Sequence, residues 1–178
     1  RHLHIPVSTV ARINEPWIAE ELIANGKTDI CMIGRPNLCD SEFANKAFAG
    51  KTDDIRPCIG CGRCLTGIMF GKPIACTVNP SVQSDAVTPA EEKKKVLVIG
   101  GGPAGMEAAY IAKMRGHEVV LCEKTEEMGG LLRLAAVPIG KQELCKVIKY
   151  MTRRLQNAGV EIRKNCEVTP DIIASEYD

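Results

Sequence analysis

The stretch Val96-Leu97-Val98-Ile99-Gly100-Gly101-Gly102-Pro103-Ala104-Gly105 decides which fold this chain is expected to have. Its four apolar residues predict a buried strand, and its glycines match the G-x-G-x-x-G turn of dinucleotide-binding folds. A helix is predicted over residues 104–115, and a second strand over residues 118–122 ends at Glu123. A strand before the turn, a helix after it and an acid one strand later are the context that such a site requires. The sequence therefore predicts an α/β domain with a dinucleotide turn, and the alternative is a structural glycine turn in another α/β protein.

Each glycine of the turn has its own expected role. Gly100 permits the tight turn, Gly102 lets the backbone approach a pyrophosphate, and Gly105 lets the helix pack closely on the strand. The helix N-terminus offers free N–H groups and a partial positive charge to the phosphates. Glu123 is predicted to accept hydrogen bonds from ribose hydroxyls. A second glycine pair, Gly129-Gly130, favours the long cofactor FAD over NAD.

The remainder of this segment predicts a β-α-β pattern. Apolar residues recur on one face of a helix over residues 142–158. Gly159 ends this helix, and residues 160–163 predict a third strand.

Four cysteines, Cys58, Cys61, Cys64 and Cys76, follow the pattern C-x2-C-x2-C-x11-C. Three thiolates on one short loop and a fourth from a distance can enclose an iron–sulfur cluster. Structural zinc is the alternative, although it usually takes two separated C-x2-C pairs. Glycines between the cysteines allow backbone N–H groups to turn toward sulfur. Cys39 and Cys166 have no predicted role.

The first 50 residues predict two β-α units, with strands over residues 5–10 and 29–34. Asn14 is predicted to cap the first helix, and a second helix is predicted over residues 41–49. Arg12 and Gly34-Arg35 close the two strands, where barrel enzymes bind phosphate. Two neighbouring arginines would suit the phosphate of FMN, although arginines are common at strand ends without such a role.

The composition of the 178 residues is ordinary for a globular protein, with 45% hydrophobic and 25% charged residues. A net charge of +1 gives no reason to expect nucleic acid as a partner. No apolar run reaches about 18 residues, the length that spans a bilayer. Nine cysteines, four of them in a ligand-like group, favour a reducing, cytoplasmic compartment and metal binding over a disulfide framework.

Several stretches together resemble one enzyme family over essentially the whole chain. They are Val10-Ala11-Arg12-Ile13-Asn14, Ile33-Gly34-Arg35-Pro36, the cysteine segment from Cys58-Ile59-Gly60-Cys61 to Cys76-Thr77-Val78-Asn79-Pro80, the glycine turn, and Met128-Gly129-Gly130. In this order they resemble the iron–sulfur flavoenzymes related to old yellow enzyme. That family of NADH:flavin oxidoreductases includes 2,4-dienoyl-CoA reductase, 2-enoate reductase and trimethylamine dehydrogenase. The cysteine spacing does not choose among these subfamilies.

The resemblance implies a role for each segment. Residues 1–50 would end an FMN-binding TIM barrel, loop-like residues 51–82 would carry a [4Fe–4S] cluster, residues 83–94 would be a linker, and residues 95–178 would begin a Rossmann-like FAD-binding domain. Arg12, Gly34 and Arg35 would hold the FMN phosphate, and Cys58, Cys61, Cys64 and Cys76 would hold the cluster. The FAD site would be lined by Gly100, Gly102, Ala104, Gly105, Glu123, Gly130, Leu131 and Arg133, with Val168 reaching the adenine from a strand-like stretch, residues 166–168.

The resemblance also implies an activity. Electrons would pass from NAD(P)H through FAD and the cluster to FMN, which would reduce an activated C=C bond of an enoate or enoyl-CoA. One alternative is an amine dehydrogenase that sends electrons from FMN through the cluster to an external carrier, with ADP in place of FAD. Another is a non-catalytic, zinc-clamped nucleotide-fold module.

The chain is expected to be an internal fragment of a larger enzyme, inactive alone, with no catalytic residue of its own. NAD(P)H and a small-molecule substrate are the expected partners of the intact enzyme, with neither nucleic acid nor membrane. Exposed strand edges of an incomplete barrel would allow a homo-oligomer.

Overall fold

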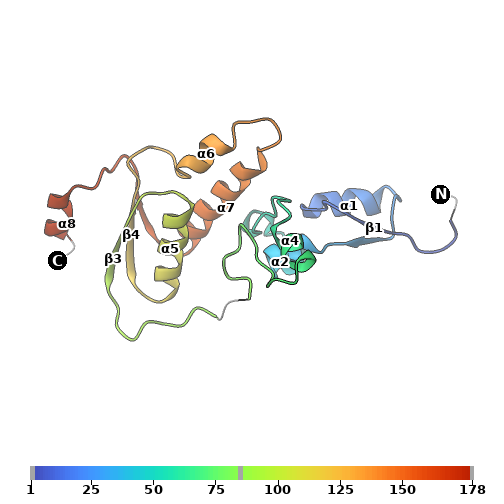
Figure 1. Cartoon of the computed structure of the whole chain (residues 1–178), viewed down its shortest axis with the longest axis horizontal. Coiled ribbons are helices and arrows are strands. Elements are labelled where there is room, and N and C mark those ends of the chain that lie inside the picture. Colours follow the sequence, from blue (N-terminus) through green and yellow to red (C-terminus); the bar gives the residue numbers. More distant parts are fainter. Residues whose placement is uncertain (1–2, 84–85, 177–178) are drawn as a thin grey trace. The chain divides into compact units, whose positions relative to one another are not determined.

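The computed structural model describes residues 3–83 and 86–176, which form two compact units, Arg1–Asp85 and Ala86–Asp178. Each unit contains one small parallel sheet (Figure 1). In the first unit β1 (Ser8–Val10) pairs with β2 (Ile30–Met32). In the second the order is β3 (Lys95–Ile99), β4 (Glu118–Cys122) and β5 (Glu161–Arg163). The expectation of an α/β chain with parallel sheets is confirmed.

The sheet of the first unit is small and only partly covered. Both strands are shorter than predicted, and α1 (Pro16–Ala24) packs against β2. The Asp29 carboxylate accepts the Val7 N–H at 2.7 Å, and the Thr28 hydroxyl lies 2.8 Å from the Val7 carbonyl oxygen. Ile30 and Met32 are nevertheless 53% and 48% exposed. Two β-α units alone therefore bury little apolar surface, as expected.

Short helices complete the first unit. They are α2 (Arg35–Cys39), α3 (Phe43–Phe48), the 3-10 helix η1 (Thr52–Asp54) and α4 (Arg63–Met69). The prediction that residues 51–82 are loop-like is wrong for α4. Gly62, at a φ of +77°, precedes this helix, and Gly71, at +61°, follows it. Glycines that suggest a loop in the sequence in fact turn the chain into and out of a helix.

The predicted cap of α1 is also wrong. The N-cap residue is Glu15, and no side chain caps the helix. The Asn14 amide instead donates to the carbonyl oxygen of Cys58 at 3.1 Å. A contact between segments distant in sequence thus replaces the local hydrogen bond that the residue type favours.

The second unit follows the predicted β-α-β pattern closely. The helices α5 (Pro103–Met114) and α7 (Glu143–Asn157) pack against each other, and α5 packs on β3 and β4. Four of the five residues of β4 are buried, as expected for the middle strand of the sheet. Residues 86–94, which precede β3, contain neither helix nor strand.

Two details of this unit differ from the sequence prediction. The short helices α6 (Leu131–Ala135) and α8 (Pro170–Glu176) were not predicted, because five to seven residues show too little periodicity. Residues 166–168, predicted to be strand-like, have no regular structure. The chain leaves β5 through Asn165, whose φ of +52° is incompatible with a continuing strand. None of the helices in the described ranges combines the length and apolar character needed to cross a bilayer.

The ion pair of Arg154 with Glu107 joins α7 to α5. The Arg154 guanidinium donates to both carboxylate oxygens of Glu107, at 2.7 and 3.2 Å. It also lies 3.3 Å from the centroid of the Tyr110 ring. The side chains of Arg154 and Glu107 are only 13% and 17% exposed, so water screens the pair weakly. The two helices are therefore held by a bidentate, charge-assisted contact as well as by apolar packing.

Replacing Glu107 tests this contact. We expect Glu107→Gln to lower the free energy of unfolding by about 2 kcal/mol, because it leaves a largely buried guanidinium without its anion. The matched control is Glu161→Gln, which breaks the exposed pair with Arg163 at 2.7 Å and should cost less than about 0.5 kcal/mol. Urea denaturation measures both values, and equal losses would show that burial adds nothing to the Arg154 pair.

Candidate cofactor sites

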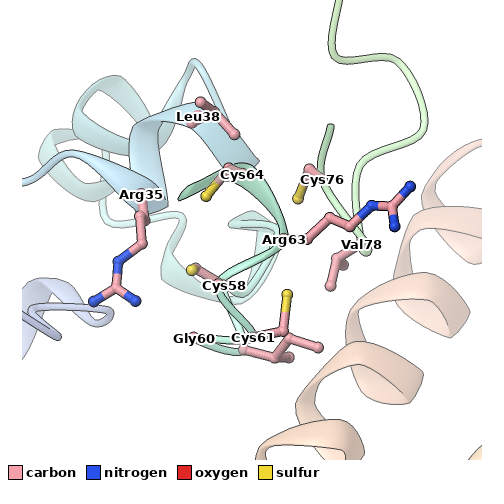
Figure 2. Close-up of a pocket in the computed structure, with 11 residues that line it drawn as sticks. Arg35, Leu38, Cys58, Gly60, Cys61, Arg63, Cys64, Cys76 and Val78 are labelled. Atoms are coloured by element: carbon pink, nitrogen blue, oxygen red, sulfur yellow. The ribbon is translucent and has the colours of Figure 1, made fainter. Parts of the chain in front are cut away.

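The four predicted cluster cysteines line one pocket of the first unit, together with Arg35. Cys58 and Cys61 lie on the loop before α4, Cys64 lies in the first turn of that helix, and Cys76 lies on the returning segment. Figure 2 shows their sulfur atoms around one region. The fold thus brings together residues that the sequence spreads over two stretches.

Glycine gives the cysteine loop its shape. Gly60 and Gly62 have φ angles of +64° and +77°, which side chains disfavour. Within α4, a Cβ atom on Gly67 would lie 2.9 Å from the Pro73 carbonyl oxygen. The segment leading to Cys76 can therefore cross α4 closely only because residue 67 has no side chain.

At Cys58, burial and hydrogen bonding act in opposite directions. Burial raises the pKa of the thiol, while the Gly60 N–H and the nearby Arg35 guanidinium lower it, and the net effect is a raised pKa. The N–H group and the cation both favour the thiolate, which is the form that binds metal.

At Cys76, hydrogen bonds lower the pKa of the thiol by more than burial raises it. A hydrogen bond from Cys39 outweighs the effect of burial, and the N–H groups of Asn79 and Val78 add to it, so the pKa falls to about 5. The same hydrogen bond, with burial, holds the pKa of Cys39 far above its usual value.

The donor set fits an iron–sulfur cluster. Three of the four cysteines share one short stretch of chain, whereas structural zinc usually takes two separated C-x2-C pairs. Four thiols on one pocket, with N–H groups directed at sulfur, match the cluster requirement.

The residues predicted to bind the FMN phosphate lie next to this loop. A Cβ atom on Gly60 would be 3.8 Å from the Arg12 guanidinium carbon, and Arg35 lines the cysteine pocket. Gly34 is the N-cap residue of α2. Arg12 therefore lies beside Gly60 of the cysteine loop, and Arg35 lies at the cysteine pocket itself.

The glycine turn of the second unit has the close packing expected of it. A Cβ atom on Gly105 would lie 2.0 Å from the Gly100 carbonyl oxygen. Gly100 has a φ of +100°. Gly102 is the N-cap of α5, and a Cβ atom there would meet no atom within 4 Å. Ala104 lies in the first turn, which carries no acidic residue. The first turn of α5 therefore carries no acidic side chain of its own, and it is open at Gly102.

The second glycine pair packs against this turn. The Gly129 N–H donates to the Gly101 carbonyl oxygen at 2.8 Å. Gly130, at a φ of +50°, approaches Gly102 so closely that a Cβ atom would lie 3.2 Å from its Cα. The structure thus brings both glycine clusters into one site.

The other residues predicted to line the FAD site are exposed or half-buried. Leu131 begins α6 and is 80% exposed, and Arg133, on the same helix, pairs with Glu127. Val168 is half-buried in the irregular segment after β5, away from any strand.

Glu123 is held by the protein itself. Its carboxylate is 6% exposed and accepts the Gly101 N–H at 2.7 Å and the Thr125 N–H and hydroxyl at 2.9 Å. Burial raises the pKa of Glu123, but these hydrogen bonds outweigh burial and lower it. The predicted ribose contact would therefore share the carboxylate with the glycine turn.

Some residues of these sites were not identified from the sequence. Thr125 holds Glu123, Asn79 directs its N–H at Cys76, and Cys39 contacts Cys76. Only Thr125 gives a local signal, because a hydroxyl two residues after an acid commonly forms a turn. Asn79 follows Cys76 by three residues, whereas Cys39 comes close to Cys76 only through the tertiary structure.

Comparison with known proteins agrees with this geometry. The family described as FAD dependent oxidoreductase matches residues 95–172. A bilirubin reductase of Mediterraneibacter gnavus is 42% identical over 176 residues, covering 97% of this chain and 28% of the relative. A metal reductase of Desulforamulus reducens is 39% identical over 175 residues, covering 96% and 26%. The solved structure of a 2-naphthoyl-CoA reductase superposes with a TM-score of 0.92 at 33% identity, covering 98% of this chain and 27% of that one.

The chain belongs to the iron–sulfur flavoenzymes related to old yellow enzyme. The chain spans about a quarter of the length of the relatives that it matches. Further relatives are a cinnamate reductase of Clostridium sporogenes, 38% identical over 95% of this chain and 26% of the relative, and a dimethylamine dehydrogenase of Hyphomicrobium, 34% identical over 91% and 23%.

The buried carboxylate of Glu123 predicts a dependence of stability on pH. Because its pKa is lowered by folding, its stabilising effect is complete above the unfolded value of about 4.3 and is lost as pH falls through the folded value. At pH 6 we expect Glu123→Gln to be less stable than wild type by about 1–3 kcal/mol. The difference should shrink toward pH 3 in urea denaturation. Glu118→Gln, an exposed acid on the same strand, controls for the lost charge, and a pH-independent difference would contradict the assignment.

Proposed function

We propose that this chain is the part of an NAD(P)H-dependent iron–sulfur flavoenzyme that joins two flavin sites. Residues 1–50 would form the end of an FMN-binding TIM barrel, and residues 51–82 the cluster segment. After a linker over residues 83–94, residues 95–178 would begin a Rossmann-like FAD-binding domain. The observation that carries the proposal is the presence, in one chain, of four cysteines on a single pocket and a glycine turn within the FAD dependent oxidoreductase match.

When bound, FAD, the [4Fe–4S] cluster and FMN would supply a path for electrons from NAD(P)H to an activated C=C bond of an enoate or enoyl-CoA type substrate. The names cinnamate reductase and 2-naphthoyl-CoA reductase among its relatives support this substrate class. No catalytic residue is proposed within this chain.

The chain's own residues would bind and orient these groups. The thiolates of Cys58, Cys61, Cys64 and Cys76 would bind iron, and the N–H groups at Gly60, Val78 and Asn79 would stabilise the negative charge on sulfur. Arg12 and Arg35, with the backbone at Gly34, would bind the FMN phosphate.

In the second unit, the first turn of α5 would bind the pyrophosphate of FAD through backbone N–H groups. Gly102 would let the phosphates approach, and Gly130 would leave room beside them. Glu123 would fix the turn while accepting a ribose hydroxyl.

A second candidate function is an amine dehydrogenase, supported by the dimethylamine dehydrogenase and histamine dehydrogenase among the relatives. The same cysteine site would then pass electrons outward, and the second unit would bind ADP. Extraction of the nucleotides bound to the full-length protein distinguishes the two: FAD supports the reductase, and ADP without FAD supports the dehydrogenase.

Cysteine variants test the cluster. In anaerobically purified full-length protein we expect about four iron and four sulfide per chain from this site. Replacing any one of the four ligands by serine should remove most of this iron, because a hydroxyl is a poor ligand for it. Cys145→Ser, at an exposed cysteine on α7, is the control and should retain the iron. About one zinc per chain, with no sulfide, would instead support the zinc-clamped module.

Two glycine variants separate folding from FAD binding. Gly105→Ala places its Cβ 2.0 Å from the Gly100 carbonyl oxygen and should destabilise the second unit by about 3 kcal/mol or more. Gly102→Ala meets no protein atom and has an ordinary φ of −71°, so stability should change by less than about 1 kcal/mol.

The flavin content gives the second measurement. Gly102→Ala should still lose most of its FAD, because the methyl group would occupy the space of the phosphates. Full FAD content in a stable Gly102→Ala protein would rule out pyrophosphate binding at this turn.

A further inference from the structure

Arg56 lies two residues before Cys58, and its side chain reaches the other end of the cysteine segment. The residue is only 8% exposed. Its guanidinium donates a hydrogen bond to the side-chain oxygen of Asn79, which lies three residues after Cys76. One buried side chain therefore connects the stretch that begins the set of cysteines with the stretch that ends it.

The main chain of Arg56 is anchored separately. Its N–H group donates to the Asp40 carboxylate at 2.7 Å, and Asp40 is the C-cap residue of α2. The same carboxylate is buried, forms an ion pair with Lys46 at 2.6 Å and accepts the Glu42 N–H at 3.1 Å. A buried carboxylate is costly unless donors or a cation surround it. These contacts therefore define the place from which the guanidinium extends.

The acceptor on Asn79 is also held in place. Its side-chain oxygen accepts a second hydrogen bond from the Ser81 N–H at 3.0 Å, which closes a turn typical of asparagine. A carboxamide oxygen has two lone pairs, and Arg56 and Ser81 use both. The turn that follows Cys76 is thus joined to Arg56 by a hydrogen bond from a charged donor, which is the stronger class in proteins.

Cys76 is the patterned cysteine that most needs such a contact. The other three lie in one short stretch, whereas Cys76 reaches the pocket after eleven intervening residues. The entropic cost of closing a loop rises with its length. The position of Cys76 therefore depends on contacts outside the loop, and the bond between Arg56 and Asn79 is one of them.

We propose that Arg56 is a positioning residue that holds Cys76 at the cluster site through Asn79. The inference rests on the proposed function, because it requires the four cysteines to bind a cluster. Arg56 is not itself a ligand, since a guanidinium has no acceptor atom. Without its hydrogen bond, Cys76 would detach more readily than the other cysteines, and the iron at Cys76 would be the first to leave.

The experiment measures loss of one iron from anaerobically purified full-length protein after ferricyanide is added. Ferricyanide takes one electron from the 2+ state of the [4Fe–4S] cluster, and the resulting 3+ state releases one Fe²⁺ and leaves a three-iron cluster of charge 1+. The EPR signal of the three-iron cluster and a ferrous chelator follow the same step independently.

Two variants break the hydrogen bond from opposite sides. Arg56→Met removes the donor, and Asn79→Ala removes the acceptor. Each should still bind about four irons before oxidation. Each should then form the three-iron cluster about tenfold faster than wild type, the factor expected for loss of one hydrogen bond from a charged group. The double variant should fall well short of the roughly hundredfold increase that independent effects would give.

Asn79→Asp keeps an acceptor oxygen and should restore most of the wild-type rate. Arg154→Met is the control, because it removes a guanidinium of similar burial from the second unit. It should leave the rate of iron loss unchanged.

A wild-type rate in Asn79→Ala would overturn the inference, and this variant decides the matter even where Arg56→Met does not fold. Equal acceleration in Arg154→Met would overturn it in favour of general destabilisation. Independent effects in the double variant would also overturn it, because Arg56 would then not act through Asn79. An iron-free wild-type protein would overturn the proposed function as well, whereas iron-loaded protein with unchanged rates in the variants would overturn this inference alone.

Discussion

The close approach of α5 to the end of β3 constrains the second unit of this chain. With no side chain at Gly105, the helix begins where a Cβ atom would lie 2.0 Å from the Gly100 carbonyl oxygen. The turn between them is then fixed from two directions, since Gly101 donates its N–H to Glu123 and accepts a hydrogen bond from Gly129. Both partners follow β4, so hydrogen bonds link the sheet, the turn and the second glycine pair.

In the first unit, too, backbone N–H groups hydrogen-bond to an acceptor that can carry negative charge. The acceptor there is cysteine sulfur instead of a carboxylate. Backbone N–H groups at Gly60, Val78 and Asn79 hydrogen-bond to cysteine sulfurs. Such hydrogen bonds matter because a buried anion is costly unless donors or cations surround it. The ion pair of Asp40 with Lys46 and the hydrogen bond of Arg56 to Asn79 supply the supporting framework.

Much of the fold could be predicted because long elements repeat a pattern. The apolar face of α7 extends over fifteen residues, and β3 and β4 are five-residue strands whose limits the sequence marks with glycine and charge. The short helices α2 and α6 escaped prediction, since five residues make little more than one turn. The sequence predicts that Asn14 caps α1, which is a local hydrogen bond. In the structure its amide donates instead to the carbonyl oxygen of Cys58, 44 residues along the chain.

By itself the sequence determined which residue types and spacings were available: the four patterned cysteines, the glycine turn and the acid after β4. These follow from residue type, because glycine favours the positive φ angles and permits the close approaches of these turns, and cysteine supplies the thiolates that bind metal. The tertiary structure decided which atoms meet. It turned the Glu123 carboxylate toward the Gly101 N–H, and it placed the Asn14 amide against the Cys58 carbonyl oxygen. Those contacts join residues far apart in the chain, and only packing of the intervening elements brings them within hydrogen-bonding distance.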